Sequence, residues 1–474
     1  MDVALPPGLR TAGILLHPTS LPSSVLGQDV YRWLDLLHEV GIGVWQMLPL
    51  GYPLIGRSPY QCASAFAIYP KLFPPTTDEL LKPSDTDWES FSQWYAANHG
   101  WVDDFALFLE LKKHFNGQEW MDWPEPYRQR DPAYLVHFRQ RMATTLQIHV
   151  QQQFRLWQQW QAIRQVAKQY GIRLFGDMPI FVAQDSADVW AHPELFLLRD
   201  DGMPEFVTGV PPDYFSETGQ RWGNPHYHWE TMRADNFKWW RERLRYHFEF
   251  FDLVRIDHFR GLETAWMIDA RCETALEGHW EKTPGSELLA CVQSEMGVLP
   301  LVAEDLGIIT PEVIALRDQY GLPGMSVLQF AFDYFEDNPH KPHNVRENTV
   351  YYTGTHDNDT LLGWFQHLQA EAQHRVRQML GLEHVQDHTA LLEHFLETVC
   401  ASAARLAIMP FQDILGLGSE ARMNTPGTIN NNWLWRFDWI DIKPSRIQAL
   451  RALLSQHGRL NEDGNNGNEQ RRNP

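Results

Sequence analysis

Eight short apolar segments recur along this chain, and most of the intervals between them have the periodicity of amphipathic helices. The segments lie at residues 12–16, 43–48, 172–177, 300–304, 325–330, 349–353 and 405–409, with one more at the start of the stretch 251–261. Strands and helices that alternate in this way are typical of a (β/α)8 TIM barrel, the α/β fold that we predict. One interval, residues 333–348, resembles a loop more than a helix.

Two long insertions interrupt the alternation, and we expect residues 1–460 to form a single barrel domain around them. Residues 51–171 carry long helical patterns, one of them opened by the capping pair Asp131-Pro132, and predict a mainly helical subdomain. Residues 178–250 are expected to be a loop-rich insertion that covers the active site. The tail at residues 461–474 is rich in Asn and Gly and is expected to be disordered.

Acidic side chains and one histidine stand at the ends of four apolar segments. Asp177, Asp257 and Glu304 end the third, fourth and fifth segments, and His356-Asp357 comes just after the seventh. In barrels of this kind the chemistry lies at the carboxyl ends of the strands. We therefore expect these side chains to meet in one active site.

The stretch 251–261 contains an alternation of charged and apolar residues. Arg255 and Asp257 are two positions apart, so they share one face of a strand, and Val254 and Ile256 share the other. A guanidinium beside a carboxylate is expected to lower the pKa of Asp257 and keep it anionic, which suits a nucleophile. A purely structural ion pair at the strand end is the alternative.

Two further carboxylates favour glycosidic chemistry, which needs two carboxyl groups astride the bond. The apolar flanks of Glu304 are expected to raise its pKa and to favour a proton donor. Asp305 is the alternative donor, although its side chain should face the other way. Asp357 and His356 could hydrogen-bond sugar hydroxyls in the transition state.

A divalent metal site is a rival interpretation of the same cluster, because His and carboxylates are common metal ligands. It would use Asp257, His258, Glu304, His356 and Asp357. Against this interpretation, no HxH pair follows the first segment, where only His17 precedes Pro18.

The composition limits the partners. The formal net charge is −20, from 40 basic and 60 acidic side chains, which disfavours nucleic acid and anionic membranes and suits a neutral substrate. The four cysteines form no CxxC pair, so no zinc or redox motif is predicted. No signal-peptide pattern and no run of ~18 apolar residues occurs, so we expect a soluble cytoplasmic protein.

Residues 209–225 combine Gly, Pro and polar residues with aromatic side chains at intervals. The segment is either an ordinary surface loop or a lid over a sugar site, with Tyr214 and Trp222 as stacking faces. Residues 412–427, after the last apolar segment, are expected to overhang the barrel mouth as well.

Four motifs resemble the signature regions of the α-amylase clan: residues 175–182 with Asp177, 254–261, 303–307 and 354–358. The sequences of these motifs, together with those of residues 13–22, 56–61 and 211–225, resemble the 4-α-glucanotransferases, called amylomaltase in bacteria and disproportionating enzyme in plants. The resemblance runs from about Gly13 to about Trp435. It implies a barrel with inserted subdomains, no C-terminal β-sandwich, and no metal or organic cofactor.

The resemblance also implies roles for individual residues. Asp257 matches the nucleophile, Glu304 the acid/base and Asp357 the transition-state stabiliser. The sugar-binding positions that it implies are Arg255, His258 and His356, together with Tyr60, Asp213, Gln220 and Trp222 from the loops.

The implied activity is the transfer of α-1,4-glucan segments from a maltooligosaccharide or amylose to the 4-hydroxyl of another glucan or glucose. The implied route is retaining, through a covalent glucosyl-aspartate. An α-glucan hydrolase with the same carboxylates and an inactive glucan-binding protein are the alternatives. No nucleic-acid or membrane partner is expected, and we expect a monomer or a weak homo-oligomer.

Overall fold

Eight parallel strands form the centre of the computed structural model, which describes residues 4–54, 56–75, 88–212 and 216–461. They are β1 (Thr11–Leu15), β2 (Val44–Gln46), β3 (Arg173–Pro179), β6 (Leu253–Asp257), β9 (Leu301–Ala303), β10 (Gly324–Val327), β11 (Thr349–Tyr352) and β12 (Leu406–Pro410). Their order is β10-β11-β12-β1-β2-β3-β6-β9. The Ala303 N–H donates to the Pro323 carbonyl, 2.8 Å away, which brings β9 beside β10. The predicted (β/α)8 barrel is confirmed.

Helices surround the strands because each buries an apolar face against them. In α1 (Gln28–Val40) this face includes Trp33 and Leu37, and the helix ends at Gly41, whose φ of 86° favours glycine. Other surrounding helices are α8 (Lys238–Phe250), α9 (Gly285–Met296), α10 (Pro311–Gln319), α13 (His388–Ala401) and α15 (Pro444–Gln456). Between β10 and β11 only the short 3-10 turn η6 (Leu328–Phe330) forms, so residues 333–348 are a loop, as predicted.

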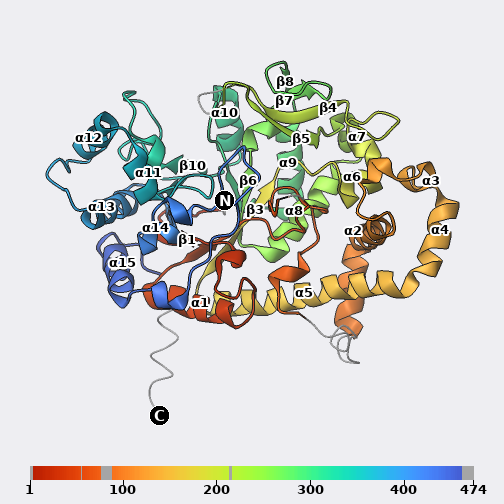
Figure 1. Ribbon diagram of the computed structural model, residues 1–474, viewed down its shortest axis with the longest axis horizontal. Helices are drawn as coiled ribbons and strands as arrows, with labels where there is room; N and C mark the ends of the chain where they lie inside the picture. Colours follow the sequence, from red (N-terminus) through yellow and green to blue (C-terminus); the bar gives the residue numbers. More distant parts are fainter. Residues whose placement is uncertain (1–3, 55, 76–87, 213–215, 462–474) are drawn as a thin grey trace, which may run out of the picture.

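The segment before β3 is largely helical. It contains α2 (Trp88–His114), α3 (Glu125–Arg128), α4 (Pro132–Arg141) and α5 (Ala143–Gln169). Figure 1 shows α2, α3 and α4 to the right of the barrel and α5 running along its lower edge to α1. The predicted cap at Asp131 is confirmed, since its side chain accepts the Ala133 N–H at 2.9 Å. We propose that residues 51–171 are a subdomain inserted into one domain of residues 1–460.

A second sheet, with the order β5-β4-β7-β8, lies beside the barrel and was not expected. Its antiparallel strands are β4 (Phe206–Val210), β5 (Gln220–Pro225), β7 (Thr264–Asp269) and β8 (His279–Lys282). The sequence did not reveal them because they are short and partly polar, and β4 finds its partner β7 far along the chain. The structure also places α6 (Ala187–Ala191), α7 (Trp229–Ala234) and α8 within residues 178–250, which corrects the description of that segment as loop-rich.

The chain after β12 adds helices to the barrel. Residues 411–461, all described, hold α14 (Phe411–Leu415) and α15 and contain no strand. Among the described residues, none of the helices combines the length and the apolar character that crossing a membrane requires. Asp213, Tyr214 and the tail at residues 462–474 lie outside the described residues.

Close packing of the barrel wall predicts the effect of one methyl group. An alanine at Gly176 in β3 would drive its Cβ into the Phe251 ring, against Cδ2. We expect Gly176→Ala to lower the free energy of unfolding by about 1–3 kcal/mol, measured by urea denaturation. Gly100→Ala in α2 is the control, because its Cβ meets no atom within 4 Å. Equal stability of Gly176→Ala and the parent protein would show that the Phe251 ring can move aside.

Candidate active site

The side chains predicted at the strand ends converge at one end of the barrel. Pairing of β3 with β6 places Asp177 beside Arg255, and pairing of β6 with β9 places Ile256 beside Ala303, the residue before Glu304. His356 and Asp357 come from the loop after β11. Tyr60 comes from the segment after β2, and its hydroxyl donates a 2.7 Å hydrogen bond to Asp177.

The Arg255 guanidinium lies at the centre of the cluster and is 5% exposed. Its Nη1 is 2.7 Å from Oδ2 of Asp177, and its Nη2 is 2.8 Å from Oδ1 of Asp257. The prediction that Arg255 and Asp257 share a face is therefore confirmed. The Asp257 side chain remains 31% exposed, so it can meet a substrate while it pairs with Arg255.

The ionisation of Asp257 differs from the sequence prediction. Burial raises the pKa of Asp257 to about 8, although Arg255 acts to lower it. Three neighbouring carboxylates add to the rise, those of Asp177, Glu304 and Asp357. The predicted low pKa is wrong, because it considered only the adjacent guanidinium, and burial together with the converging carboxylates outweighs that cation.

Glu304 is held by the backbone on both carboxylate oxygens. Oε2 accepts the His258 N–H at 2.7 Å, and Oε1 accepts the Leu306 N–H at 3.0 Å. Burial raises the pKa of Glu304, as its apolar flanks predict, while Arg255 and the two N–H groups act in the opposite direction. Because the Glu304 anion contributes to the raised pKa of Asp257, the two carboxyl groups titrate as an interacting pair.

Asp305 faces away from this pair, as predicted. Its Oδ2 is 2.5 Å from Nη1 of Arg317, and its Oδ1 accepts the Met325 N–H at 2.7 Å. Both oxygens serve the packing of β10 and α10 against β9. The alternative assignment of Asp305 as proton donor is therefore wrong.

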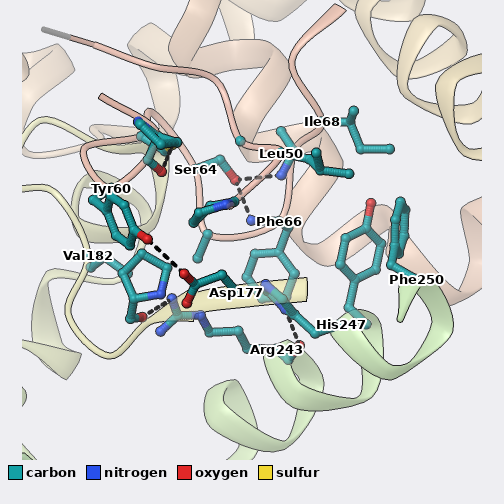
Figure 2. A pocket seen from close by; sticks show the side chains of 18 of the residues that line it. Leu50, Tyr60, Ser64, Phe66, Ile68, Asp177, Val182, Arg243, His247 and Phe250 are labelled. Atoms are coloured by element: carbon teal, nitrogen blue, oxygen red, sulfur yellow. Dashed lines mark hydrogen bonds between the residues drawn. The ribbon is translucent and has the colours of Figure 1, made fainter. Parts of the chain in front are cut away.

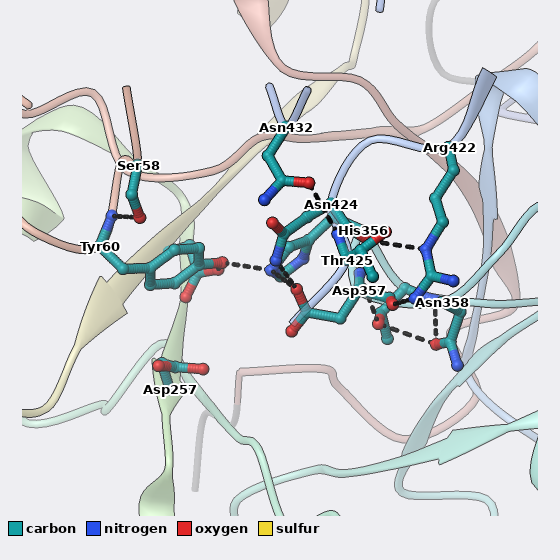
Figure 3. A network of polar contacts seen from close by, with 12 residues as sticks. Ser58, Tyr60, Asp257, His356, Asp357, Asn358, Arg422, Asn424, Thr425 and Asn432 are labelled. Atoms are coloured by element: carbon teal, nitrogen blue, oxygen red, sulfur yellow. Dashed lines mark hydrogen bonds and ion pairs between the residues drawn. The ribbon is translucent and has the colours of Figure 1, made fainter. Parts of the chain in front are cut away.

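His356 joins Tyr60 in a stacked pair with ring centroids 5.3 Å apart (Figure 3). The Tyr60 oxygen is 2.9 Å from Nε2 of His356. Burial lowers the pKa of His356, so the ring is neutral. The single hydroxyl hydrogen of Tyr60 is donated to Asp177. In the contact with His356 the Tyr60 oxygen must therefore accept, which places the imidazole proton on Nε2.

Asp357 is 45% exposed and is held by the segment after β12. Asn424 Nδ2 donates to its Oδ1 at 2.7 Å, and Arg422 Nη2 donates to its backbone carbonyl at 2.7 Å (Figure 3). Trp433, whose ring lies 5.9 Å from that of His356, also borders the site. The sequence did not predict Arg422, Asn424 or Trp433 as site residues. It indicated only that residues 412–427 follow the last strand and would overhang the barrel mouth.

Residues of the second sheet approach the site from the side. Trp222 Nε1 donates to Oε1 of Gln220 at 3.2 Å, and the Trp222 ring meets the His258 ring edge to face at 4.8 Å. Burial lowers the pKa of His258 to about 3, so this ring is neutral. Gln220 and Trp222 thus reach the cluster, whereas the predicted site residue Asp213 lies outside the described residues.

A cavity of about 60 Å³ lies beside Asp177, between the barrel and α8 (Figure 2). Tyr60, Asp177, Arg243 and His247 are among its lining residues. Arg243 Nη2 donates to the Pro179 carbonyl at 2.5 Å and so anchors the end of β3 that carries Asp177.

The described residues contain no group of three or more His, Cys, Asp or Glu side chains placed to hold a metal ion. At the centre of the cluster, Asp177 and Asp257 each direct an oxygen at the Arg255 guanidinium. The cluster therefore offers a set of carboxyl groups around the buried Arg255 guanidinium. One of these groups, Asp257, is partly exposed and interacts with a second carboxyl group, that of Glu304.

Comparison with known proteins places this arrangement in a family. The sequence profile of the family described as 4-alpha-glucanotransferase matches residues 16–87 and 71–441. The 4-alpha-glucanotransferase of Thermus thermophilus is 43% identical over 500 residues, covering 95% of this chain and 99% of the relative. The chloroplastic/amyloplastic 4-alpha-glucanotransferase of Arabidopsis thaliana is 38% identical over 518 residues, covering 97% and 88%.

Solved structures give the same result. The amylomaltase of Streptococcus agalactiae, solved in complex with acarbose, superposes with a TM-score of 0.90 and 32% identity, covering 95% of this chain and 100% of that chain. The amylomaltase of Corynebacterium glutamicum has a TM-score of 0.76 at 17% identity, covering 95% of this chain and 75% of that one, and supports the fold alone.

The coupling of Asp257 and Glu304 predicts a measurable pKa change. Because the anion of Glu304 contributes to the raised pKa of Asp257, Glu304→Gln is expected to lower the pKa of Asp257 from about 8. Carboxyl-carbon NMR titration of Asp-labelled protein would measure this, with the signal assigned by Asp257→Asn. Asp318→Asn, half-exposed and away from the cluster, is the control. An unchanged Asp257 titration in Glu304→Gln would show that the two groups are independent.

Proposed function

Because this chain belongs to the 4-alpha-glucanotransferase family, glycoside hydrolase family 77, we propose that it transfers segments of α-1,4-glucan between saccharides. The donor is a maltooligosaccharide or amylose, and the acceptor is the 4-hydroxyl of another glucan or of glucose. The observation that carries the proposal is the arrangement of Asp257, Glu304 and Asp357 around Arg255. A donor–acceptor reaction between neutral sugars also suits a chain with a formal net charge of −20.

In the first step, a carboxylate oxygen of Asp257 attacks the anomeric carbon as the glycosidic C–O bond breaks. In the reactive state Asp257 is the anion, stabilised by the 2.8 Å contact with Arg255, and the proton resides on Glu304. Glu304 then delivers this proton to the leaving glucan oxygen. The raised pKa of Glu304 supports the role of proton donor.

In the second step, the 4-hydroxyl oxygen of the acceptor attacks the glucosyl-aspartate and its proton passes to Glu304. The bond between the sugar and Asp257 breaks, and both carboxyl groups return to their starting states. Two inversions at one carbon give net retention. The Glu304 carboxylate, held by the His258 and Leu306 N–H groups, can take up this proton, so Glu304 acts as acid and base in turn.

The remaining residues are assigned to the sugar. Asp357, oriented by Asn424, and neutral His356 are placed to hydrogen-bond hydroxyls of the sugar ring that reacts. Arg255, His258 and Tyr60 complete this pocket, while Gln220 and Trp222 offer a polar and an aromatic contact at its rim. Asp213 enters the proposal through its sequence motif alone.

Transfer rather than hydrolysis requires that the acceptor site bind glucan and exclude water. The contact of Trp222 with His258 supports this, because it brings an aromatic ring of the second sheet to the residue beside Asp257. We further propose that the enzyme works in the cytoplasm as a monomer or weak homo-oligomer. It needs no metal ion or organic cofactor and has no nucleic-acid or membrane partner.

Maltotriose as the only substrate provides the central test. We expect glucose together with maltopentaose and longer chains, at constant total reducing ends, with products resolved by chain length over time. Asp257→Ala should lower the rate by ~10⁴-fold or more, because it removes the nucleophile. Asp269→Ala is the matched control, since Asp269 also ends a strand and pairs with an Arg two residues away.

The other outcomes of this assay identify the alternatives. Rising reducing ends with only glucose and maltose would mean that water is the acceptor and that the enzyme is a hydrolase. Saccharide binding without turnover, unchanged in Asp257→Ala, would mean a glucan-binding protein. Loss of activity in the presence of a chelator would support the rival interpretation of the cluster as a divalent metal site.

The shared proton predicts the pH dependence of kcat/KM. Activity needs one proton on the Asp257/Glu304 pair, so the rate falls at low pH when both are protonated and at high pH when both are ionised. The alkaline limb is expected near pH 8, the pKa of Asp257, and the acid limb above the ordinary range of a glutamate, because burial raises both pKa values. Initial rates from about pH 4 to about pH 10 would measure this, and an activity that stays flat toward alkaline pH would contradict the shared proton.

A further inference from the structure

The loop that carries His356 and Asp357 joins two elements of regular structure. It begins at Thr353, directly after β11, and ends at Leu361, where α11 (Leu361–His367) starts. Under the proposed function both side chains contact the reacting sugar, so the position of this loop determines the geometry of the site. The groups that hold the two ends of the loop therefore matter for catalysis.

Asp413 contacts both ends of this loop. It lies on α14, directly after β12, and is 1% exposed. Its Oδ2 accepts the Thr353 hydroxyl at 2.7 Å, and its Oδ1 accepts the Leu361 N–H at 2.7 Å. Both donors belong to fully buried residues. One carboxylate from a neighbouring strand end thus joins the start and the end of the loop.

The loop between these ends is braced by hydrogen bonds of its own. Oδ1 of Asn358 accepts the Thr355 N–H at 2.8 Å and the Thr355 hydroxyl at 2.9 Å. The same Thr355 oxygen accepts the Asp357 N–H at 3.3 Å. A shift at either end is therefore transmitted to His356 and Asp357.

Packing alone does not fill the space behind this loop. A cavity of about 20 Å³ lies there, lined among others by His17, Thr355, His356 and Asp413. This volume is enough for about one water molecule. The buried Nδ1 of His17 has no hydrogen-bond partner among the described atoms.

Both oxygens of Asp413 accept hydrogen bonds, as those of a carboxylate can. Burial raises the pKa of Asp413 to about 6, and the Leu361 N–H and the Thr353 hydroxyl act to lower it. A carboxylate accepts hydrogen bonds on both oxygens, and bonds to a charged acceptor are stronger than neutral ones.

We propose that Asp413 is a positioning residue of the active site, which clamps residues 353–361 through Thr353 and Leu361 and so places His356 and Asp357 against the sugar. The inference rests on the proposed function and adds to it a residue that never meets the substrate. The clamp acts on the loop geometry of the reacting complex, so its loss should reduce kcat more than it changes KM.

The test removes the hydroxyl donor and leaves the fold intact. Thr353→Val is expected to lower kcat with maltotriose by ~10- to 100-fold while KM stays within about threefold, because a small misplacement near the chemistry is costly. Thr353→Ser keeps the hydroxyl and should restore kcat to within about threefold of the parent. Thr349→Val is the matched control, as a buried threonine at the opposite end of β11. Asp413→Asn, which keeps an acceptor for the Leu361 N–H, should fall between the parent and Thr353→Val.

Crystal structures of the parent protein and Thr353→Val provide a readout independent of activity. A displaced loop in Thr353→Val supports the clamp, even if Asp413→Asn does not fold. An unmoved loop, an unchanged kcat in Thr353→Val, or an equal loss in Thr349→Val overturns it. A parent protein that does not disproportionate maltotriose would refute the proposed function instead, and the position of Asp357 in the two crystal structures would still decide the clamp.

Discussion

The buried guanidinium of Arg255 is the constraint on which the rest of the site depends. A cationic residue that is 5% exposed must have its charge compensated, and Asp177 and Asp257 do this at its Nη1 and Nη2, 2.7 and 2.8 Å away. The register of β3 against β6 places Asp177 beside Arg255 and leaves Asp257 two residues further toward the mouth. One carboxylate is therefore fully buried, and the other is exposed enough to react.

Crowding of negative charge around this cation sets the ionisation of the whole cluster. Burial and neighbouring carboxylates raise the pKa of Asp257, and burial raises that of Glu304. The surrounding His258 and His356 rings are neutral, since burial lowers the pKa of each. The two carboxyl groups with raised pKa values are therefore surrounded by neutral imidazoles, which fits the proposed acid and nucleophile at one carbon atom.

Elements outside the eight strands orient these groups. The segment after β12 contacts Asp357 through Arg422 and Asn424, and α14 contacts the ends of the same loop through Asp413. The second sheet brings Trp222 to His258, because β4 pairs with both β5 and β7. Each of these contacts joins parts of the chain that are far apart in sequence.

The sequence by itself determined the barrel, the polar strand ends and the shared face of Arg255 and Asp257, because strand alternation and apolar periodicity are local properties. It also predicted that Asp305 would face away from Glu304, for the same reason. Only the tertiary structure decided the raised pKa of Asp257, the second sheet and the contacts of Asn424 and Asp413. Burial, electrostatic coupling and pairing between distant segments depend on which strands become neighbours, and the local pattern of residues does not contain that information.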